Sequence, residues 1–474
     1  MNFIIAEAIS HEPIENSTGD KLFCARALKP SSPKHAAISE IFERAPVSYF
    51  MKAGRYLAHY LKIKHPLVFV TDWTDPTELI GLRLETNGAT TDYPNLCFLA
   101  FYTNWDNISA SGIEDIFAHE FSHMWMTWLG MDYSLSMSNK FHCSTATTDF
   151  YLAFSEGFAE WLEIVTKDLS GYVPADGELW DYAFDGNAQL SARERQLRYH
   201  AVKNNRFIYQ TATPYPEDFN TYTNLHMAHI TSSAFTPEKL RNASQMLSCE
   251  GAVASVFYQI YAHEMFKNRY EGEEFYAAFG ADLHNLDTTC NLLIKMVYAM
   301  SKIDLKKPSL MTDFIRSYGE CFPDEKAELY NVFTKTTHFV TASHTARDLF
   351  GEIYRIGRRG VTEEIVHIIR NIRNPLVADL REKLLNGQIP LDAATYKEIW
   401  IIGDEEIAPT PWEPDEKVPY RFNINTATAI DFMALNGITL NLGEQLVIAR
   451  EKQYGFDSID EFMQTKDALN KTKS

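Results

Sequence analysis

The segment His119-Glu120-Phe121-Ser122-His123 constrains the local fold of this chain more than any other part of the sequence. On an α-helix, side chains four residues apart lie about 40° apart around the axis and one turn apart along it. Both imidazoles would therefore face a single point, and imidazole nitrogen is a preferred ligand of zinc. Glu120 directly follows the first histidine, where its carboxylate could take a proton from metal-bound water. The segment thus predicts a helix that supplies two metal ligands.

A second segment, Ser155-Glu156-Gly157-Phe158-Ala159-Glu160-Trp161, carries two carboxylates one helical turn apart. A catalytic zinc site has three protein ligands and leaves one position open for water. Glu156 could be the third ligand, and Glu160 could accept the free ring N–H of a ligand histidine and so fix its tautomer. The alternative is that both acids lie on a solvated helix face. The neighbouring Phe154, Phe158 and Trp161 favour a helix that is buried in the core.

The two segments, HEFSHMW and SEGFAEWLE, resemble the zinc motifs of the gluzincin metallopeptidases, specifically those of the aminopeptidase N-like and glycyl-aminopeptidase-like branches. The metzincins are excluded, because Met126 and Leu129 occupy the positions at which their longer motif has glycine and histidine. Including weaker matches on both sides, the resemblance covers residues 88–266.

The resemblance implies both a metal site and a reaction. One Zn²⁺ per chain would be bound by His119, His123 and Glu156, with Glu160 in contact with a ligand. Zinc would polarise the scissile carbonyl and lower the pKa of its water, while Glu120 would act as general base. The expected function is therefore zinc-dependent hydrolysis of peptide bonds in a peptide or protein substrate.

A weaker match lies upstream of the zinc motifs. Residues 88–98, GATTDYPNLCF, fall where the family has the strand that binds substrate. The resemblance implies substrate contacts for Asp92, Leu96 and Phe98. The family's GAMEN sequence is absent, so Asp92 is the counterpart of the acid that holds the free amine of a substrate.

The downstream match concerns the group that stabilises the oxyanion. Residues 248–252, SCEGA, are similar to the family segment that carries a transition-state tyrosine, but Ser248 occupies the position of that tyrosine. Four other residues are candidates for this role: Tyr222, His226, His229 and Tyr258.

The spacing of the motifs also departs from the family pattern. The 32 residues between His123 and Glu156 exceed the usual spacer, which predicts an inserted loop that contains His142 and Cys143. Together with the missing GAMEN sequence and tyrosine, this departure weakens the assignment as an aminopeptidase more than the assignment as a zinc peptidase.

The catalytic region is expected to have an α+β fold. Residues 1–110 are predicted to be its strand-rich part, because short apolar runs are bounded there by Pro, Asn and Gly. Residues 111–324 are predicted to be its helical, zinc-binding part. A helix is expected to begin at Ser111-Gly-Ile-Glu114, which has the form of a capping box. Further helices are expected over about 150–168 and 251–266.

The rest of the chain is expected to contain a helical continuation at 325–402, a linker rich in proline and acids at 403–419, and an all-α module at 420–474. The module resembles a helix-hairpin-helix of the competence-protein type. In that family, backbone N–H groups of a Gly-Ile-Gly hairpin bind a DNA phosphate. Here Gly437 and Ile438 are followed by Thr439 in place of the second glycine. The module contains six basic and seven acidic residues. A protein partner is therefore expected in preference to DNA.

Composition limits the remaining possibilities. The net charge of −19 argues against broad binding to nucleic acid or anionic membranes. Six scattered cysteines do not form a disulfide framework. No apolar run is long enough to span a bilayer, and the N-terminus lacks the form of a secretory signal, so cytoplasmic residence is expected.

Two alternatives to a free zinc peptidase remain. One is a protease tethered to DNA through the C-terminal module. The other is a non-catalytic scaffold that keeps zinc for stability, although a structural site has no need of a base such as Glu120.

Overall fold

The computed structural model describes residues 3–74, 76–140, 142–171, 198–212, 234–270, 272–282, 286–358, 360–407 and 417–471. Helices and strands are mixed in these residues, as the α+β expectation requires. They form two compact units: Met1–Asp132, Phe158–Val173 and His263–Lys306 in the first, and Tyr133–Gly157, Pro174–Ala262 and Lys307–Ser474 in the second. Within the described residues, no helix is long and apolar enough to cross a membrane.

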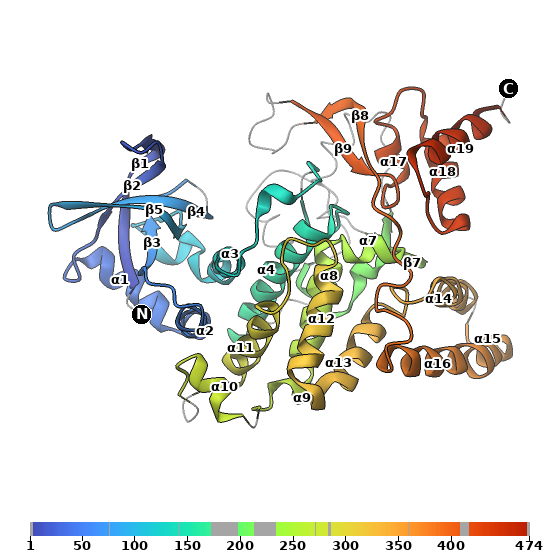
Figure 1. Ribbon diagram of the computed structural model, residues 1–474, viewed down its shortest axis with the longest axis horizontal. Coiled ribbons are helices and arrows are strands. Elements are labelled where there is room, and N and C mark those ends of the chain that lie inside the picture. The colour runs from blue at the N-terminus through green and yellow to red at the C-terminus, as the bar shows by residue number, and fades with distance from the viewer. Residues whose placement is uncertain are drawn as a thin grey trace. The chain divides into compact units, whose positions relative to one another are not determined.

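The first unit contains a five-stranded barrel (Figure 1). Its strands are β1 (Phe3–Glu15), β2 (Lys21–Ala27), β3 (Leu67–Thr71), β4 (Thr77–Thr86) and β5 (Ala89–Ala100). They close in the order β1-β2-β4-β5-β3, with β1 antiparallel to β2 and β4 antiparallel to β5. Ala6, Val68, Leu82, Leu96 and Phe98 belong to the core between the strands. This arrangement leaves β5 paired on both sides, with β4 and β3.

Helices α1 (Pro33–Glu43) and α2 (Val47–Tyr60) lie between β2 and β3 in the chain, so the segment predicted to be strand-rich also holds two helices. Ser32 caps α1, because its side chain accepts a hydrogen bond from the N–H of His35 at 3.2 Å. The other helices of this unit are α3 (Ile113–Trp128), α9 (Glu264–Lys267), α10 (Glu273–Ala278), α11 (Thr288–Met300) and the later part of α4 (Phe150–Leu169).

Helix α3, which carries the HEFSH segment, packs on this unit through its aromatic side chains. Phe117 lies 5.3 Å from Phe42 of α1 and 5.8 Å from Phe69 of β3, measured between ring centroids. Phe121 passes so close to α2 that a Cβ atom at Gly54 would lie 2.3 Å from its ring. Glycine at position 54 is therefore what allows α2 and α3 to approach each other.

The capping box expected at the start of α3 is not formed. The helix begins at Ile113, and Gly112 occupies the cap position with φ +67° and no side-chain hydrogen bond. Residues 108–111 form a short 3₁₀ turn before it, which places Ser111 one position too early to cap the helix. Glycine adopts this left-handed conformation without steric cost, so the backbone conformation at Gly112 determines where the helix begins.

The second unit is mainly helical. Among the described residues before the tail, its helices include α7 (Ala243–Leu247), α8 (Glu250–Ala262), α12 (Leu310–Cys321), α13 (Pro323–Thr336), α14 (His344–Gly357), α15 (Glu363–Ile368) and α16 (Asn374–Leu385). A two-stranded ribbon, β6 (Tyr209–Ala212) and β7 (Ala234–Leu240), precedes α7. Phe154 of α4 packs against Phe257 of α8 and Phe314 of α12, with ring centroids 5.7 and 6.4 Å apart. The helix predicted over 251–266 is interrupted at His263, which is the N-cap residue of α9.

The C-terminal tail combines a ribbon with three helices (Figure 1). It has its own apolar core. Its elements are β8 (Trp400–Ile407), β9 (Val418–Asn423), α17 (Ala429–Phe432), α18 (Leu440–Gln453) and α19 (Ile459–Lys471). The tail is therefore not all-α, and the segment predicted as a linker begins inside a strand. Exposed and half-buried residues alternate along β8, and Asp404 and Glu406 take exposed positions. Two of the acids that indicated a linker, Asp404 and Glu406, thus lie on the solvent face of a strand.

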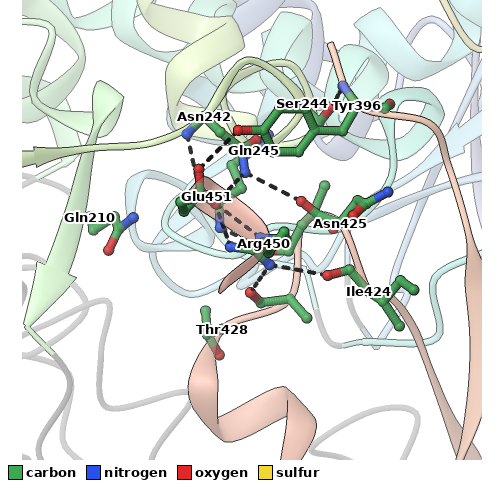
Figure 2. Close-up of polar contacts among 12 residues, drawn as sticks. Gln210, Asn242, Ser244, Gln245, Tyr396, Ile424, Asn425, Thr428, Arg450 and Glu451 are labelled. Carbon is green, nitrogen blue, oxygen red and sulfur yellow. Dashed lines mark hydrogen bonds and ion pairs between the residues drawn. The ribbon is translucent and has the colours of Figure 1, made fainter. Parts of the chain in front are cut away.

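The tail is joined to α7 by buried polar contacts (Figure 2). Asn242, which caps α7, donates to the Glu451 carboxylate at 3.0 Å, and Gln245 donates to the carbonyl of Thr426 at 2.9 Å. Arg450, whose side chain is fully buried, donates to the carbonyls of Ile424 and Ala427. These buried polar groups are hydrogen-bonded to one another instead of to water, so the tail is an integral part of the second unit.

Candidate metal centre

Helix α3 presents the first two candidate ligands. The rings of His119 and His123 lie 5.0 Å apart between centroids. His123 is buried and His119 half-buried, while Phe117 and Phe121 on the same helix are fully buried. The aromatic packing therefore fixes the orientation of the helix, and the four-residue spacing then places both imidazoles together as expected. Glu120 is half-buried on the same helix.

Helix α4 carries the third candidate ligand and is embedded as predicted. Its N-terminus is held by Asp149, whose carboxylate accepts a hydrogen bond from the N–H of Leu152 at 2.7 Å. Phe154, Phe158 and Trp161 are all 1% exposed or less. The alternative of a solvated helix face is therefore wrong for this segment. Glu156 is 8% exposed and Glu160 is 1% exposed.

Gly157, next to Glu156, allows α4 to lie directly against α8. A Cβ atom at this position would be 2.7 Å from the Cβ of Val253 and 2.8 Å from the carbonyl oxygen of Glu250. No side chain larger than hydrogen fits at such distances. The glycine of the SEGFAEW segment thus has a packing role beside the candidate ligand.

The structure brings His119, His123 and Glu156 together as one group. Each offers one ligand atom, and these atoms all lie within 4.8 Å of one another. Two imidazole nitrogens and one carboxylate oxygen form a donor set that suits zinc and related divalent metals. The residues therefore fit a metal ion, as the sequence predicts for these three positions.

A third histidine, His142, lies between Glu156 and a second carboxylate, Glu250. The Nδ1 atom of His142 lies 3.8 Å from the Oε2 of Glu156 and 3.5 Å from the Oε1 of Glu250. Glu250 is 4% exposed in the first turn of α8, whereas the His142 side chain is 47% exposed. The sequence predicts an inserted loop that contains His142, whereas Glu250 is a residue of the site that the sequence does not predict. The only available signal for Glu250 was its place in the SCEGA segment.

Glu250 also influences a neighbouring thiol. Burial, and then the negative charge of Glu250, raise the pKa of Cys143 to about 12. The Cys143 side chain is therefore a protonated, unreactive thiol at neutral pH, because the thiolate is the reactive form.

The loop predicted as an insertion, described at residues 133–140 and 142–149, is held together by Asp149. Asp149 accepts hydrogen bonds from the hydroxyl of Ser136 at 2.6 Å and from the N–H groups of Met137 and Ser138 at 2.9 Å each. Arg241 donates to the hydroxyl of Thr147 at 2.8 Å. The loop also pairs with the segment before α8, where the N–H of Thr148 donates to the carbonyl of Ser248 at 2.8 Å.

The same loop is fixed to the tail. The side-chain amide of Asn139 pairs with the backbone of β9, donating to the carbonyl of Pro419 at 2.6 Å and accepting from the N–H of Arg421 at 2.8 Å. The next residue, Lys140, forms a buried ion pair with Asp431 at 3.0 Å. The loop that carries His142 is therefore ordered by residues from the far end of the chain.

The residues expected to contact substrate have other surroundings. The Asp92 carboxylate accepts two hydrogen bonds from Arg83, at 2.6 and 2.7 Å, and this partner lowers the pKa of Asp92. Leu96 is 2% exposed and Phe98 is fully buried, both inside the barrel. Leu96 and Phe98 are two residues apart on β5, so their side chains share one face of the strand, and this face belongs to the barrel core.

Of the candidates for the oxyanion group, only Tyr258 belongs to the described part of the chain. It is 8% exposed on α8, with the ammonium of Lys203 5.4 Å from its ring centroid. Tyr222, His226 and His229 lie outside the described residues. Ser248, at the position of the family tyrosine, donates its hydroxyl to the carbonyl of Ser244 at 2.7 Å and is 1% exposed.

Comparisons with known proteins add no relative to this description. No protein-family model, no curated protein and no solved structure matches the chain. The two motifs and the geometry of their residues are therefore what indicates a function.

Proposed function

We propose that this protein is a zinc-dependent metallopeptidase of the gluzincin type. The observation that carries the proposal is the convergence of His119, His123 and Glu156, whose ligand atoms lie within 4.8 Å of one another. Two histidines from one helix and a glutamate from another match the ligand set of gluzincin zinc sites, which leave a fourth position for water. The resemblance of the two segments to that family supports the same assignment.

The roles of the chain's own residues follow from this assignment. Zinc, when bound, would supply Lewis acidity and lower the pKa of a coordinated water. Glu120, adjacent to His119 and half-buried, would accept a proton and deliver it to the leaving amine. Glu160, which is 1% exposed and one turn beyond Glu156, would accept a ring N–H and hold a ligand histidine in position.

The proposal is for a peptidase in the broad sense. An aminopeptidase needs an acid that binds the free amine of the substrate. Asp92, the expected counterpart, is already paired with Arg83 through two hydrogen bonds. With the expected acid engaged in this way, the geometry supports hydrolysis of peptide bonds and gives no reason to restrict it to the N-terminal residue.

The first test combines metal analysis with cleavage of a mixed peptide library. We expect about one zinc per chain, lost in His119→Ala, His123→Ala and Glu156→Ala. Glu160→Ala should retain zinc with an affinity roughly 10- to 100-fold weaker, which is the usual effect of a residue that supports a ligand. Full zinc retention by Glu156→Ala would contradict the proposed ligand set.

The second test separates catalysis from metal binding. Glu120→Gln should keep zinc and thermal stability but lower kcat/KM by roughly 100-fold or more, since a general base contributes about that much. Glu114→Gln on the same helix is the matched control, because Glu114 lies in an exposed ion pair with Arg44. If zinc-loaded wild type cleaves no peptide in the library, a zinc-stabilised scaffold is the better explanation.

A further inference from the structure

A cavity of about 260 Å³ lies in the second unit, where the first residue of α4 meets the last residue of α7. The start of α12 and the loop before β8 complete its wall. Pockets for small organic ligands usually measure roughly 300–1,000 Å³, so this one suits a single ring or a short chain. None of its lining residues belongs to the metal-binding group or is Glu120.

The lining combines an apolar surface with charge of one sign. Phe150, Leu247 and Met311 supply apolar walls, and the charged groups in the wall are the carboxylates Asp392 and Glu398. No basic side chain is among the lining residues in the described part of the chain. A pocket of this kind complements a ligand with an apolar body and a positive charge.

Asp392 is held in place by its neighbours. The hydroxyl of Thr312, in the first turn of α12, donates to its carboxylate at 3.3 Å, and the hydroxyl of Thr395 donates to its backbone carbonyl at 2.8 Å. Both threonines also line the cavity. One carboxylate is therefore positioned in the wall by residues that leave the cavity itself open.

Glu398 is in a different electrostatic situation. Burial, and then the negative charge of Asp149, raise the pKa of Glu398 to about 7, although Trp400 donates a hydrogen bond that opposes the rise. Asp149 itself is engaged by Ser136, Leu152 and two backbone N–H groups of the inserted loop. Among the described residues, no lysine or arginine contributes to the charge balance of Glu398. A cation in the cavity would therefore offset an otherwise uncompensated carboxylate.

We propose that this cavity binds a small primary amine with an apolar body, whose ammonium group faces Asp392 and Glu398 while its ring or chain lies between Phe150, Leu247 and Met311. The proposal is independent of the metallopeptidase assignment, because it uses none of the residues of the metal-binding group. Acidic residues tuned by burial in a pocket are typical of functional sites.

The test uses the full chain, calorimetric titration and benzylamine as the probe. At pH 8 we expect saturable binding with Kd on the order of 0.1–1 mM, as is usual for a ligand of about eight heavy atoms. Benzyl alcohol, a neutral molecule of the same shape, should bind at least 10-fold more weakly, and benzoate should not bind. These comparisons require no variant and so do not depend on the stability of a mutant.

The pH dependence identifies the group involved. Between pH 8 and pH 5.5 the ionised fraction of Glu398 falls, because its pKa is about 7, so Kd should rise about 10- to 30-fold. Glu398→Gln should show the weaker affinity at both pH values. Glu364→Gln, a change of the same kind at an exposed position, should leave both values unchanged.

Three outcomes would overturn the proposal. They are equal affinity for benzyl alcohol and benzylamine, unchanged affinity in a folded Glu398→Gln protein, and no saturation below about 10 mM at pH 8. Binding that is lost in His123→Ala but kept in Glu398→Gln would assign the amine to the metal centre instead. The cavity proposal fails in that case, while the proposed peptidase function is unaffected.

Discussion

The ammonium of Lys140 lies 3.0 Å from the carboxylate of Asp431, and both side chains are buried. Lys140 belongs to the loop between the two candidate zinc motifs, and Asp431 belongs to α17 of the tail, 291 residues later. Burial alone would raise the pKa of Asp431, but the charge of Lys140 and the hydroxyl of Tyr420 reverse this effect and lower it. The pair therefore ties the loop that carries His142 to the C-terminal tail.

Breaking this pair should destabilise the protein strongly. Asp431→Ala leaves the Lys140 ammonium buried without its partner, and such losses cost about 3–5 kcal/mol. We expect a decrease of that size in the free energy of unfolding, measured by urea denaturation. Lys140→Met combined with Asp431→Leu should recover part of it, because no isolated charge remains.

The matched control is an exposed pair of the same charge type. Asp379→Ala removes the partner of Lys383 on α16, where both side chains are about half exposed. Exposed pairs contribute about 0–1 kcal/mol, so this change should have little effect. Equal losses in Asp431→Ala and Asp379→Ala would show that the buried pair does not anchor the tail.

His338 should make stability depend on pH. Burial, and then the positive charge of Arg373, lower the pKa of His338 to about 4. Because the unfolded histidine binds a proton near pH 6.5 and the folded one does not, stability should fall as pH decreases from about 6.5 towards 4. Between pH 7 and pH 5 the contribution is about 2 kcal/mol.

The comparison that isolates this effect is urea denaturation of wild type and His338→Asn at several pH values. Asparagine tolerates the left-handed backbone at this position, where φ is +51°, and it does not titrate. The substitution will cost some packing against Phe350, whose ring centroid lies 4.8 Å away. That cost does not vary with pH, so parallel pH profiles of the two proteins would contradict the assignment.

Gly157→Ala should disturb the metal centre without touching a ligand. The added methyl would lie 2.7 Å from the Val253 side chain and 2.8 Å from the Glu250 carbonyl, so α4 or α8 must shift. Overpacking of this kind costs about 1–3 kcal/mol. Because Glu156 is the adjacent residue, zinc affinity measured by chelator competition should also fall, by roughly 10-fold or more.

Gly357→Ala provides the control for helix propensity. The nearest atom to a methyl at this position lies 3.9 Å away, so it fits without displacement. Alanine should leave stability unchanged or raise it slightly, since glycine is the weaker helix former. Wild-type zinc affinity in Gly157→Ala would show that the close approach of α4 and α8 does not position Glu156.

The sequence predicted the parts of the site that depend on local spacing. His119 and His123 converge because they are four residues apart on a helix, and that relation holds wherever the helix packs. Glu156 could be identified because it and Glu160 are one helical turn apart in a segment that resembles a zinc motif, and the apolar neighbours Phe154 and Phe158 indicated a buried helix. Both conclusions use the chain within one or two helical turns.

The surroundings of the site could not be predicted in this way. Glu250 approaches His142 across 108 residues of chain, and Lys140 meets Asp431 across 291. Nothing in the local pattern of either segment specifies its partner, because such contacts are fixed by the packing of whole elements. Likewise, Leu96 and Phe98 belong to a segment that resembles a substrate-binding strand, but the closure of the barrel makes them core residues.

The tail should not bind DNA, although it resembles a helix-hairpin-helix module. Phosphate would have to reach N–H groups around Gly437, but the N–H of the preceding Asn436 already donates to the Asp404 carboxylate at 2.7 Å. Arg450, a cation of the module, is fully buried and donates to backbone carbonyls. The net charge of −19 opposes approach to a polyanion.

In fluorescence anisotropy with a labelled duplex at physiological salt, the full chain should bind no more tightly than about 10⁻⁴ M, the weak end of non-specific affinity. Asp404→Asn removes the competing charge at the hairpin and should not change this result. Micromolar binding that weakens with salt would instead favour a protease tethered to DNA, and a further gain in Asp404→Asn would assign the contact to the hairpin.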